Sequence, residues 1–257
     1  MKLSIVIPAY NESESITGTI KAIEETLIQH NIEHETFVVN DNSTDNTIKV
    51  LDELCEKYPS LKYETNIGPN GFGYAVRYGL ERFSGDCVAV MMADLSDSPD
   101  DLLGFYNKMI EDNVDCVFGD RWCQNGTVID YPWQKKIINR IANRIIRMVI
   151  NITYNDTTNA FKLYKKTTIE GIKPFLSPHF NLTIELPLKA IIRGYSFAIV
   201  PNSWTNRVYG KSKLNIREMG SRYFFILMYC LIEKYFSKGD FKKNPPEGLT
   251  RTLQNLS

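Results

Sequence analysis

Two carboxylates follow an apolar run in the stretch VMMADLSDSPDD, residues 90–101. Asp94 and Asp97 lie where a buried strand would end, and carboxylates in that position can hold a divalent cation that neutralises a diphosphate. A solvated turn that opens a helix has the same pattern, because SPDD supplies an N-cap serine, a proline at N1 and acids in the first turn. Met92 lies where a further carboxylate would be expected, so any cation here has one fewer protein ligand.

Two more polar segments could contact a nucleotide. In NDNSTDNT, residues 40–47, Asp41 could accept hydrogen bonds from a base or a ribose, whereas Asp45 has the position of a helix N-cap. GPNGFGYAVRYG, residues 68–79, places three glycines before a helix. Those glycines allow the backbone to approach either a ligand or a neighbouring strand closely.

Basic residues also follow predicted strands. NRVYGKSKL, residues 206–214, gathers Arg207, Lys211 and Lys213 around a glycine, and such cations either close over phosphates or form a solvated loop. Arg121 in GDRW follows another strand, where it either faces a ligand or pairs with an acid in the cleft.

The elements that must position these residues alternate between strand and helix, which predicts a mainly parallel sheet with right-handed crossovers. Strands are expected at 3–7, 36–39, 61–64, 87–91, 114–118, 160–164 and 197–200, and helices at 16–27, 74–82, 137–152, 185–193 and 216–236, with others starting near 45 and 98. Ligands bind at the carboxyl ends of strands in such sheets. The segments PAYNE, NDNSTD, MADLSD and GDRW should therefore meet at one edge.

The composition is that of an ordinary globular protein. The 257 residues suffice for one large α/β domain, and 30 basic against 30 acidic residues give no reason to expect a nucleic-acid partner. Five cysteines without metal-ligand spacing fit a reducing cytosol. The most apolar segment, residues 223–232, is too short to span a bilayer.

Three parts of the chain are expected. Residues 1–215 form the catalytic domain, and residues 239–257 form a mobile C-terminal tail. Residues 216–238 form an amphipathic aromatic helix that either lies on a membrane surface or belongs to a core or a dimer interface.

Eight stretches, in order along the chain, resemble family 2 glycosyltransferases close to the dolichyl- and polyprenyl-phosphate mannose synthases. They are VIPAYNE (6–12), VNDNSTDNT (39–47), GFGYAVRYG (71–79), MADLSDSPDD (92–101), FGDRW (118–122), TNAFKLYKK (158–166), RGY (193–195) and NRVYGKSKL (206–214). The resemblance implies a GT-A fold, in which a Rossmann-like, mainly parallel sheet flanked by helices carries one nucleotide-sugar site.

The resemblance also implies roles for individual residues. The nucleotide would contact Pro8, Tyr10, Glu12, Asp41, Ala93 and Asp94. Stabilisation of the diphosphate and catalysis would fall to Asp94, Asp97, Arg121, Arg207 and Lys213. The acceptor would contact Arg140, Lys211 and Ser212. Asp94 matches the second aspartate of the family's Asp-x-Asp motif and would hold Mg²⁺ or Mn²⁺ with Asp97, while Met92 replaces the first aspartate.

The expected activity is inverting transfer of a hexose from a nucleotide-sugar of the GDP-mannose or UDP-glucose type to a polyprenyl or dolichyl phosphate. A lipid phosphate is already an oxyanion and needs no general base, which suits a site rich in Arg and Lys. The enzyme would be cytoplasmic and peripheral on the cytoplasmic face of a membrane.

Three alternative functions can be compared with these features. A saccharide hydroxyl acceptor in surface-polysaccharide synthesis would need a base, for which Asp97 is the first candidate. An inactive nucleotide-sugar-binding homologue would explain Met92. A sugar-1-phosphate nucleotidyltransferase is disfavoured, because PAYNE after the first strand has neither the Gly nor the Arg of a triphosphate-binding loop.

Overall fold

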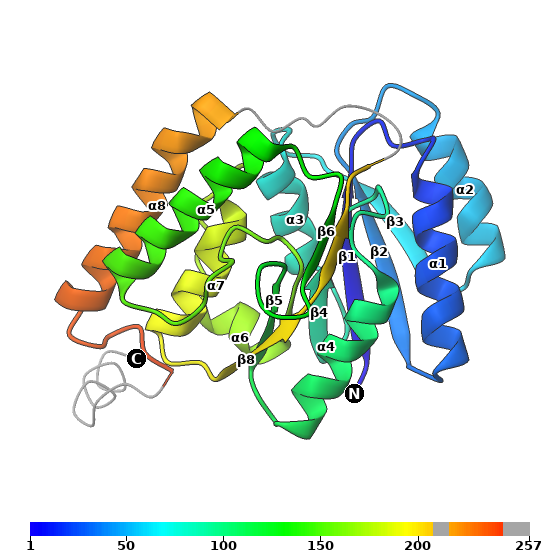
Figure 1. Ribbon diagram of the computed structural model, residues 1–257. Coiled ribbons are helices and arrows are strands. Elements are labelled where there is room, and N and C mark those ends of the chain that lie inside the picture. The colour runs from blue at the N-terminus through cyan, green and yellow to red at the C-terminus, as the bar shows by residue number, and fades with distance from the viewer. Residues whose placement is uncertain (208–215, 244–257) are drawn as a thin grey trace, which may run out of the picture.

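A seven-stranded sheet forms the centre of the protein in the computed structural model, which describes residues 1–207 and 216–243 (Figure 1). The strands are β1 (Leu3–Ala9), β2 (His34–Asn40), β3 (Leu61–Thr65), β4 (Cys87–Val90), β5 (Cys116–Asp120), β7 (Lys162–Lys165) and β8 (Phe197–Pro201). Their order is β3-β2-β1-β4-β7-β5-β8, and only β7 is antiparallel to its neighbours. The predicted mainly parallel sheet is confirmed. A separate parallel pair joins β6 (Thr127–Ile129) to β9 (Ser203–Thr205).

Helices cover both faces of the sheet. One face packs against α1 (Ile16–Gln29), α2 (Thr47–Lys57) and α4 (Pro99–Glu111), and the other against α3 (Phe72–Leu80), α6 (Lys166–Gly171) and α7 (Leu182–Ile192). Beyond α7 lie α5 (Trp133–Ile150) and α8 (Ile216–Phe236), side by side on the left of Figure 1. Within the described ranges, no helix is both long and apolar enough to cross a bilayer.

Two predicted helix starts can be compared with the structure. Ser98 caps α4 as expected, because its hydroxyl accepts a hydrogen bond from the backbone amide of Asp100. The N-cap of α2 is Asn46 rather than Asp45. Asp45 nevertheless satisfies the helix start, since its carboxylate accepts hydrogen bonds from both the amide and the hydroxyl of Thr47.

The glycine-rich segment before α3 serves close packing. A Cβ at Gly73 would lie 2.5 Å from the carbonyl carbon of Pro178 and 2.6 Å from the amide nitrogen of His179. Gly71 has a φ of +145°, a conformation that other residues rarely adopt. The sequence left open whether these glycines let the backbone approach a ligand or a neighbouring strand. At Gly73 the backbone approaches another backbone segment, but that segment is the loop before α7 and not a strand.

A buried charge cluster ties α1 to the start of β2. The fully buried Glu24 accepts hydrogen bonds from Thr36 and Ser60, and its Oε2 lies 3.0 Å from Nε2 of His34. Nδ1 of His34 lies 2.8 Å from the carbonyl oxygen of Ile32. Burial alone would lower the pKa of His34, but the hydrogen bond and charge of Glu24 outweigh it and raise that pKa above its ordinary value.

The C-terminal segment is described as far as Lys243. Its Nζ lies 2.7 Å from Oδ2 of Asp115, and its amide donates a hydrogen bond to the carbonyl oxygen of Arg193. The remainder of the predicted mobile tail lies outside the described residues, and its mobility stays a prediction.

Candidate active site

A cavity of about 860 Å³ opens at the carboxyl edge of the sheet. Its polar part is lined by residues at or just after the carboxyl ends of β1, β2, β4 and β5: Pro8, Ala9, Tyr10, Glu12, Asp41, Met92, Asp94, Ser96, Asp97 and Arg121. The prediction that PAYNE, NDNSTD, MADLSD and GDRW meet at one edge is confirmed. Parallel strands bring these segments together although they are far apart in the sequence.

Arg207 joins the acidic segment to the first loop. Its Nη2 lies 2.5 Å from Oδ2 of Asp94, and its Nη1 lies 3.5 Å from Oε1 of Glu12. The other oxygen of Asp94 accepts a hydrogen bond from the amide of Ser96. Arg207, at the start of the basic segment, therefore contacts two carboxylates that were predicted to face the nucleotide-sugar.

Asp97 is the most perturbed carboxylate in the cavity. Its side chain is buried, and Oδ2 accepts a hydrogen bond of 3.2 Å from the amide of Met92. Burial, helped by the negative charge of Asp94, raises the pKa of Asp97 to about 7. A carboxyl with such a pKa can exchange protons near neutral pH, which is what a general base or acid requires.

Arg121 lines the cavity but is already paired. Its Nε and Nη2 donate hydrogen bonds of 2.8 and 2.9 Å to the two oxygens of Asp156, and its backbone amide donates another to the same carboxylate. The two side chains are 7% and 0% exposed. Burial opposes the charge, yet Asp156 keeps the pKa of Arg121 above its ordinary value. The predicted alternative was an ion pair with Asp120 or another acid in the cleft. Arg121 does form an ion pair, but its partner is Asp156, which is outside the described cavity lining.

A buried lysine supports the floor of the cavity. Lys162 Nζ donates hydrogen bonds to the carbonyl oxygens of Thr157, Asn159 and Thr183. Burial lowers the pKa of Lys162 to about 7, while the charge of Asp156 opposes that shift. The segment around Asn159 lines the cavity, so Lys162 fixes the position of a cavity wall.

Asp41 connects the second loop to the glycine-rich segment. Its oxygens accept hydrogen bonds of 2.7 Å from the amide of Gly71 and 2.9 Å from the side-chain amide of Asn66. Asp41 and Gly71 both line the cavity. The carboxylate thus shapes the predicted nucleotide end.

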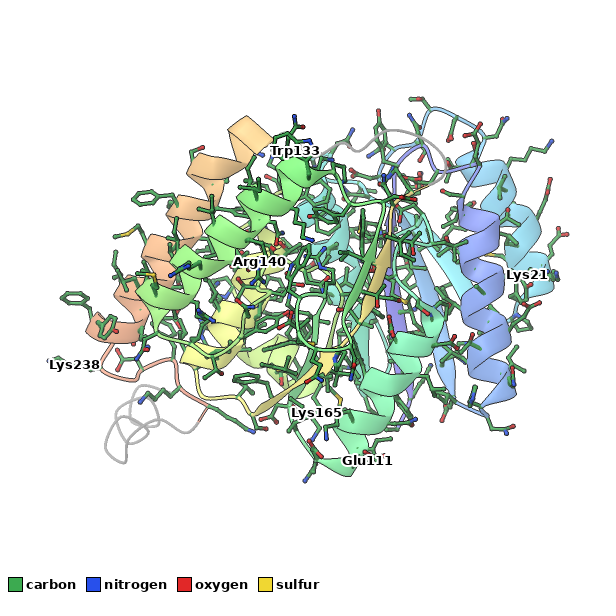
Figure 2. The ribbon with its side chains drawn as sticks, viewed as in Figure 1. Lys21, Glu111, Trp133, Arg140, Lys165 and Lys238 are labelled. Atoms are coloured by element: carbon green, nitrogen blue, oxygen red, sulfur yellow. The ribbon has the colours of Figure 1, made fainter. Side chains whose placement is uncertain are left out.

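The remaining predicted site residues take different places. Ala93 is 3% exposed and packs in the core, where its carbonyl oxygen accepts a hydrogen bond from Thr19; it is not part of the described cavity lining. Arg140, labelled on α5 in Figure 2, lies over the ring of Trp122 at 5.6 Å from the centroid, and Lys135 of the same helix lines the cavity instead. The predicted contacts of Lys211, Ser212 and Lys213 lie outside the described residues.

The fit to a divalent cation rests on two carboxylates. Asp94 and Asp97 offer the hard oxygen ligands that Mg²⁺ and Mn²⁺ prefer, whereas the thioether of Met92 is a poor ligand for either. Among the described residues, no group of three His, Cys, Asp or Glu side chains could enclose a metal ion. The donor set therefore fits a cation that takes most of its ligands from a diphosphate and water.

Sequence reasoning missed the other end of the cavity. The cavity continues between α5, α7 and α8 along apolar side chains: Ile138, Ala142, Ile145, Ile146, Phe180, Tyr223, Phe224 and Leu227. It also missed Lys135 and Asp156. The isoleucine periodicity of α5 was visible, but it indicates only that one side of the helix is buried, not that this side faces a cavity.

This sheet, with an acidic segment at its carboxyl edge facing Arg207, defines a protein of the GT-A class. The chain belongs to glycosyl transferase family 2, which its sequence matches over residues 4–172.

Two relatives have assigned activities. The chain is 30% identical over 218 residues to a dolichol-phosphate mannosyltransferase of Pyrococcus furiosus, covering 83% of this chain and 59% of that one. It is also 30% identical over 225 residues to a polyprenol monophosphomannose synthase of Mycolicibacterium smegmatis, covering 83% of this chain and 82% of the other. The chain thus spans less than two thirds of the Pyrococcus protein.

Among solved structures, the fold is similar to that of glucosyl-3-phosphoglycerate synthase from Mycobacterium tuberculosis. A complex of that enzyme with Mn²⁺, uridine diphosphate and phosphoglyceric acid superposes with a TM-score of 0.68 at 17% identity, over 90% of this chain and 78% of the other. A complex with uridine diphosphate alone gives 0.66 at 17% identity, over 90% and 80%. At this identity the likeness establishes the GT-A fold.

Proposed function

We propose that this protein transfers a hexose from a nucleotide-sugar to a polyprenyl phosphate, with inversion at the anomeric carbon. The observation that carries the proposal is the continuity of the cavity, which joins a polar end at the strand termini to an apolar end between α5, α7 and α8. A polyprenyl phosphate has the matching chemistry, because its headgroup is charged and its tail is a hydrocarbon. The two mannosyltransferase relatives support the same class of acceptor.

The chemistry required is mainly charge stabilisation. The acceptor phosphate is already a nucleophilic oxyanion, so the principal barrier is the charge that grows on the leaving nucleoside diphosphate. Arg207, held between Asp94 and Glu12, brings a cation to that position. Lys135, at the start of α5, also lines the cavity and would bind the acceptor phosphate. An Mg²⁺ or Mn²⁺ ion held by Asp94 and Asp97 would add further positive charge beside the diphosphate.

The apolar end of the cavity opens towards an exposed apolar surface. On α5 this surface comprises Ile137, Ile138, Ile141, Ile145, Met148 and Val149, and on α8 it comprises Phe224, Phe225, Ile232, Tyr235 and Phe236. Ile138, Ile145 and Phe224 belong to both the surface and the cavity. Arginines 140, 144 and 147 of α5 are exposed beside it. This combination suits peripheral attachment to the anionic cytoplasmic face of a membrane, from which a lipid tail could enter the cavity.

A saccharide hydroxyl acceptor is the second candidate. The observation in its favour is Asp97, whose pKa of about 7 suits a general base that removes the proton from a hydroxyl. The apolar half of the cavity would then have no substrate group to bind.

A direct test is a transfer assay with the full chain. Undecaprenyl phosphate in anionic vesicles is incubated with GDP-mannose or UDP-glucose, with Mn²⁺ or with a chelator, and the lipid product is identified by mass spectrometry. We expect a lipid-phosphate hexose from one donor and at least a hundredfold loss in Asp94→Ala, since Asp94 positions Arg207 and the cation. Transfer to a free saccharide, with none to the lipid phosphate, would contradict the proposal.

A further inference from the structure

Three aromatic side chains lie together beside the catalytic carboxylates. Trp204 and Tyr131 both line the cavity, with ring centroids 4.8 Å apart and planes at 63°. Trp122 contacts the other side of Tyr131, at 5.6 Å and 78°. The charge stabilisation proposed above uses none of them.

The backbone around Trp204 is fixed to the acidic segment. The amide and hydroxyl of Ser203 both donate hydrogen bonds of 2.7 Å to Oδ2 of Asp101, in the first turn of α4. The amide of Thr205 donates a hydrogen bond of 3.1 Å to the carbonyl oxygen of Ser96. Trp204, which lies between these two anchors, is thereby held beside the segment that carries Asp94 and Asp97.

Trp204 and Tyr131 are also close in the sequence to the two cations proposed to bind the phosphates, and all four residues line the cavity. Trp204 shortly precedes Arg207, which reaches Asp94 at the diphosphate. Tyr131 shortly precedes Lys135, which lines the cavity towards its apolar end. In a donor complex, the group between the leaving diphosphate and the incoming acceptor is the transferred sugar.

We propose that the ring of Trp204, supported by Tyr131, forms the wall against which the sugar of the nucleotide-sugar packs. This inference rests on the proposed function and deepens it. The C–H face of a pyranose carries weak positive charge and packs well on the negative face of an aromatic ring. Asp97 lines the same part of the cavity and can accept hydrogen bonds from the sugar hydroxyls. The wall thus recognises a hexose and not the nucleoside diphosphate itself.

The test compares nucleotide-sugars with the matching nucleoside diphosphates. The affinities of UDP-glucose, UDP, GDP-mannose and GDP are measured by calorimetry for the full chain, without acceptor or membrane. The variants are Trp204→Ala and Trp204→Phe, with Trp133→Ala as the matched control, because Trp133 is 68% exposed and is outside the described cavity lining.

We expect Trp204→Ala to lower the affinity for the nucleotide-sugar about tenfold, while the affinity for the nucleoside diphosphate changes by less than about twofold. Trp204→Phe should recover part of the loss, and Trp133→Ala should resemble the wild type. Equal losses for sugar-bearing and sugar-free nucleotides would overturn the inference, as would no loss for either. If the wild type binds nucleoside diphosphates but neither nucleotide-sugar, the proposed function itself fails.

A measurement on the wild type keeps the inference testable if Trp204→Ala does not fold. The chain has three tryptophans, so their fluorescence can be followed during titration and compared with that of Trp204→Phe. Nucleotide-sugar should change the wild-type emission more than nucleoside diphosphate does, and this excess should vanish in Trp204→Phe. An excess that persists in Trp204→Phe would overturn the inference.

Discussion

The pairing of Arg121 with Asp156 makes a quantitative prediction. Asp156→Asn keeps the shape of the side chain but removes the charge that balances a buried guanidinium. Breaking a buried pair by neutralising one partner typically costs about 3–5 kcal/mol, because the other charge stays buried and uncompensated. An asparagine oxygen in the position of Oδ2 can still accept two of the three hydrogen bonds, so we expect a value near the lower limit, about 3 kcal/mol. For a chain of this length, the melting temperature should fall by about 6–12 °C.

The assay is thermal and urea unfolding of four proteins: wild type, Asp156→Asn, Arg121→Gln and the double variant. If the guanidinium and the carboxylate interact as the distances indicate, the double variant should lose less stability than the sum of the two single losses. Additive losses, or a shift below about 2 °C in Asp156→Asn, would refute the reasoning. Donor binding should also weaken in Asp156→Asn, since Arg121 lines the cavity.

Three further predictions concern other parts of the molecule. The pKa of His34 is raised in the folded state, so the stability that its ion pair with Glu24 contributes is complete below about pH 6.5 and is lost as the pH rises through the folded-state pKa. In urea unfolding, His34→Gln should therefore lower the free energy of unfolding more at pH 6 than at pH 9. Gly73→Ala should lower the melting temperature by several degrees, because the added Cβ would meet backbone atoms at 2.5 Å. Gly104→Ala in α4 should instead raise the free energy of unfolding by about 0.5–1 kcal/mol, since a Cβ there meets nothing within 4 Å. Equal shifts in the two variants would contradict this. Ile141→Glu on α5 should reduce binding to anionic vesicles about tenfold in a flotation assay, while the equally exposed Ile110→Glu on α4 should not.

Local patterns were sufficient for most of the elements and for the edge at which they meet, although the short elements β6, α6 and β9 were not predicted. The apolar run before Asp94 and the cap at Ser98 are short-range signals, and β4 and α4 lie where those signals predicted. The antiparallel insertion of β7 between β4 and β5 was not predictable, because each strand's own pattern says nothing about its neighbours. Some boundaries also moved, such as the start of α5 at Trp133, since capping and packing at helix ends depend on contacts from elsewhere.

The choice of partners was beyond sequence reasoning. Arg121 was recognised as a cation at the cavity, but which acid it pairs with depends on how the segment after α5 folds back to bring Asp156 beneath it. Arg140 and Lys135 are both basic residues of α5, and the rotation of that helix against α7 and α8 turns Lys135 to the cavity. An α-helix has about 3.6 residues per turn, so these two residues, five apart in the sequence, lie about 140° apart around the helix and do not face the same side.

The sequence by itself determined the order of most strands and helices, the family, and the edge where Asp41, Asp94 and Arg121 would lie. The elements and the edge follow from residue periodicity, from turn chemistry and from the rule that parallel strands end together, whereas the family follows from the resemblance of eight motifs. Only the tertiary structure decided that Arg207 contacts Asp94, that Asp156 neutralises Arg121, and that the cavity continues into an apolar channel. These properties arise from side chains distant in the sequence, whose contacts are set by packing and by competition among nearby charges.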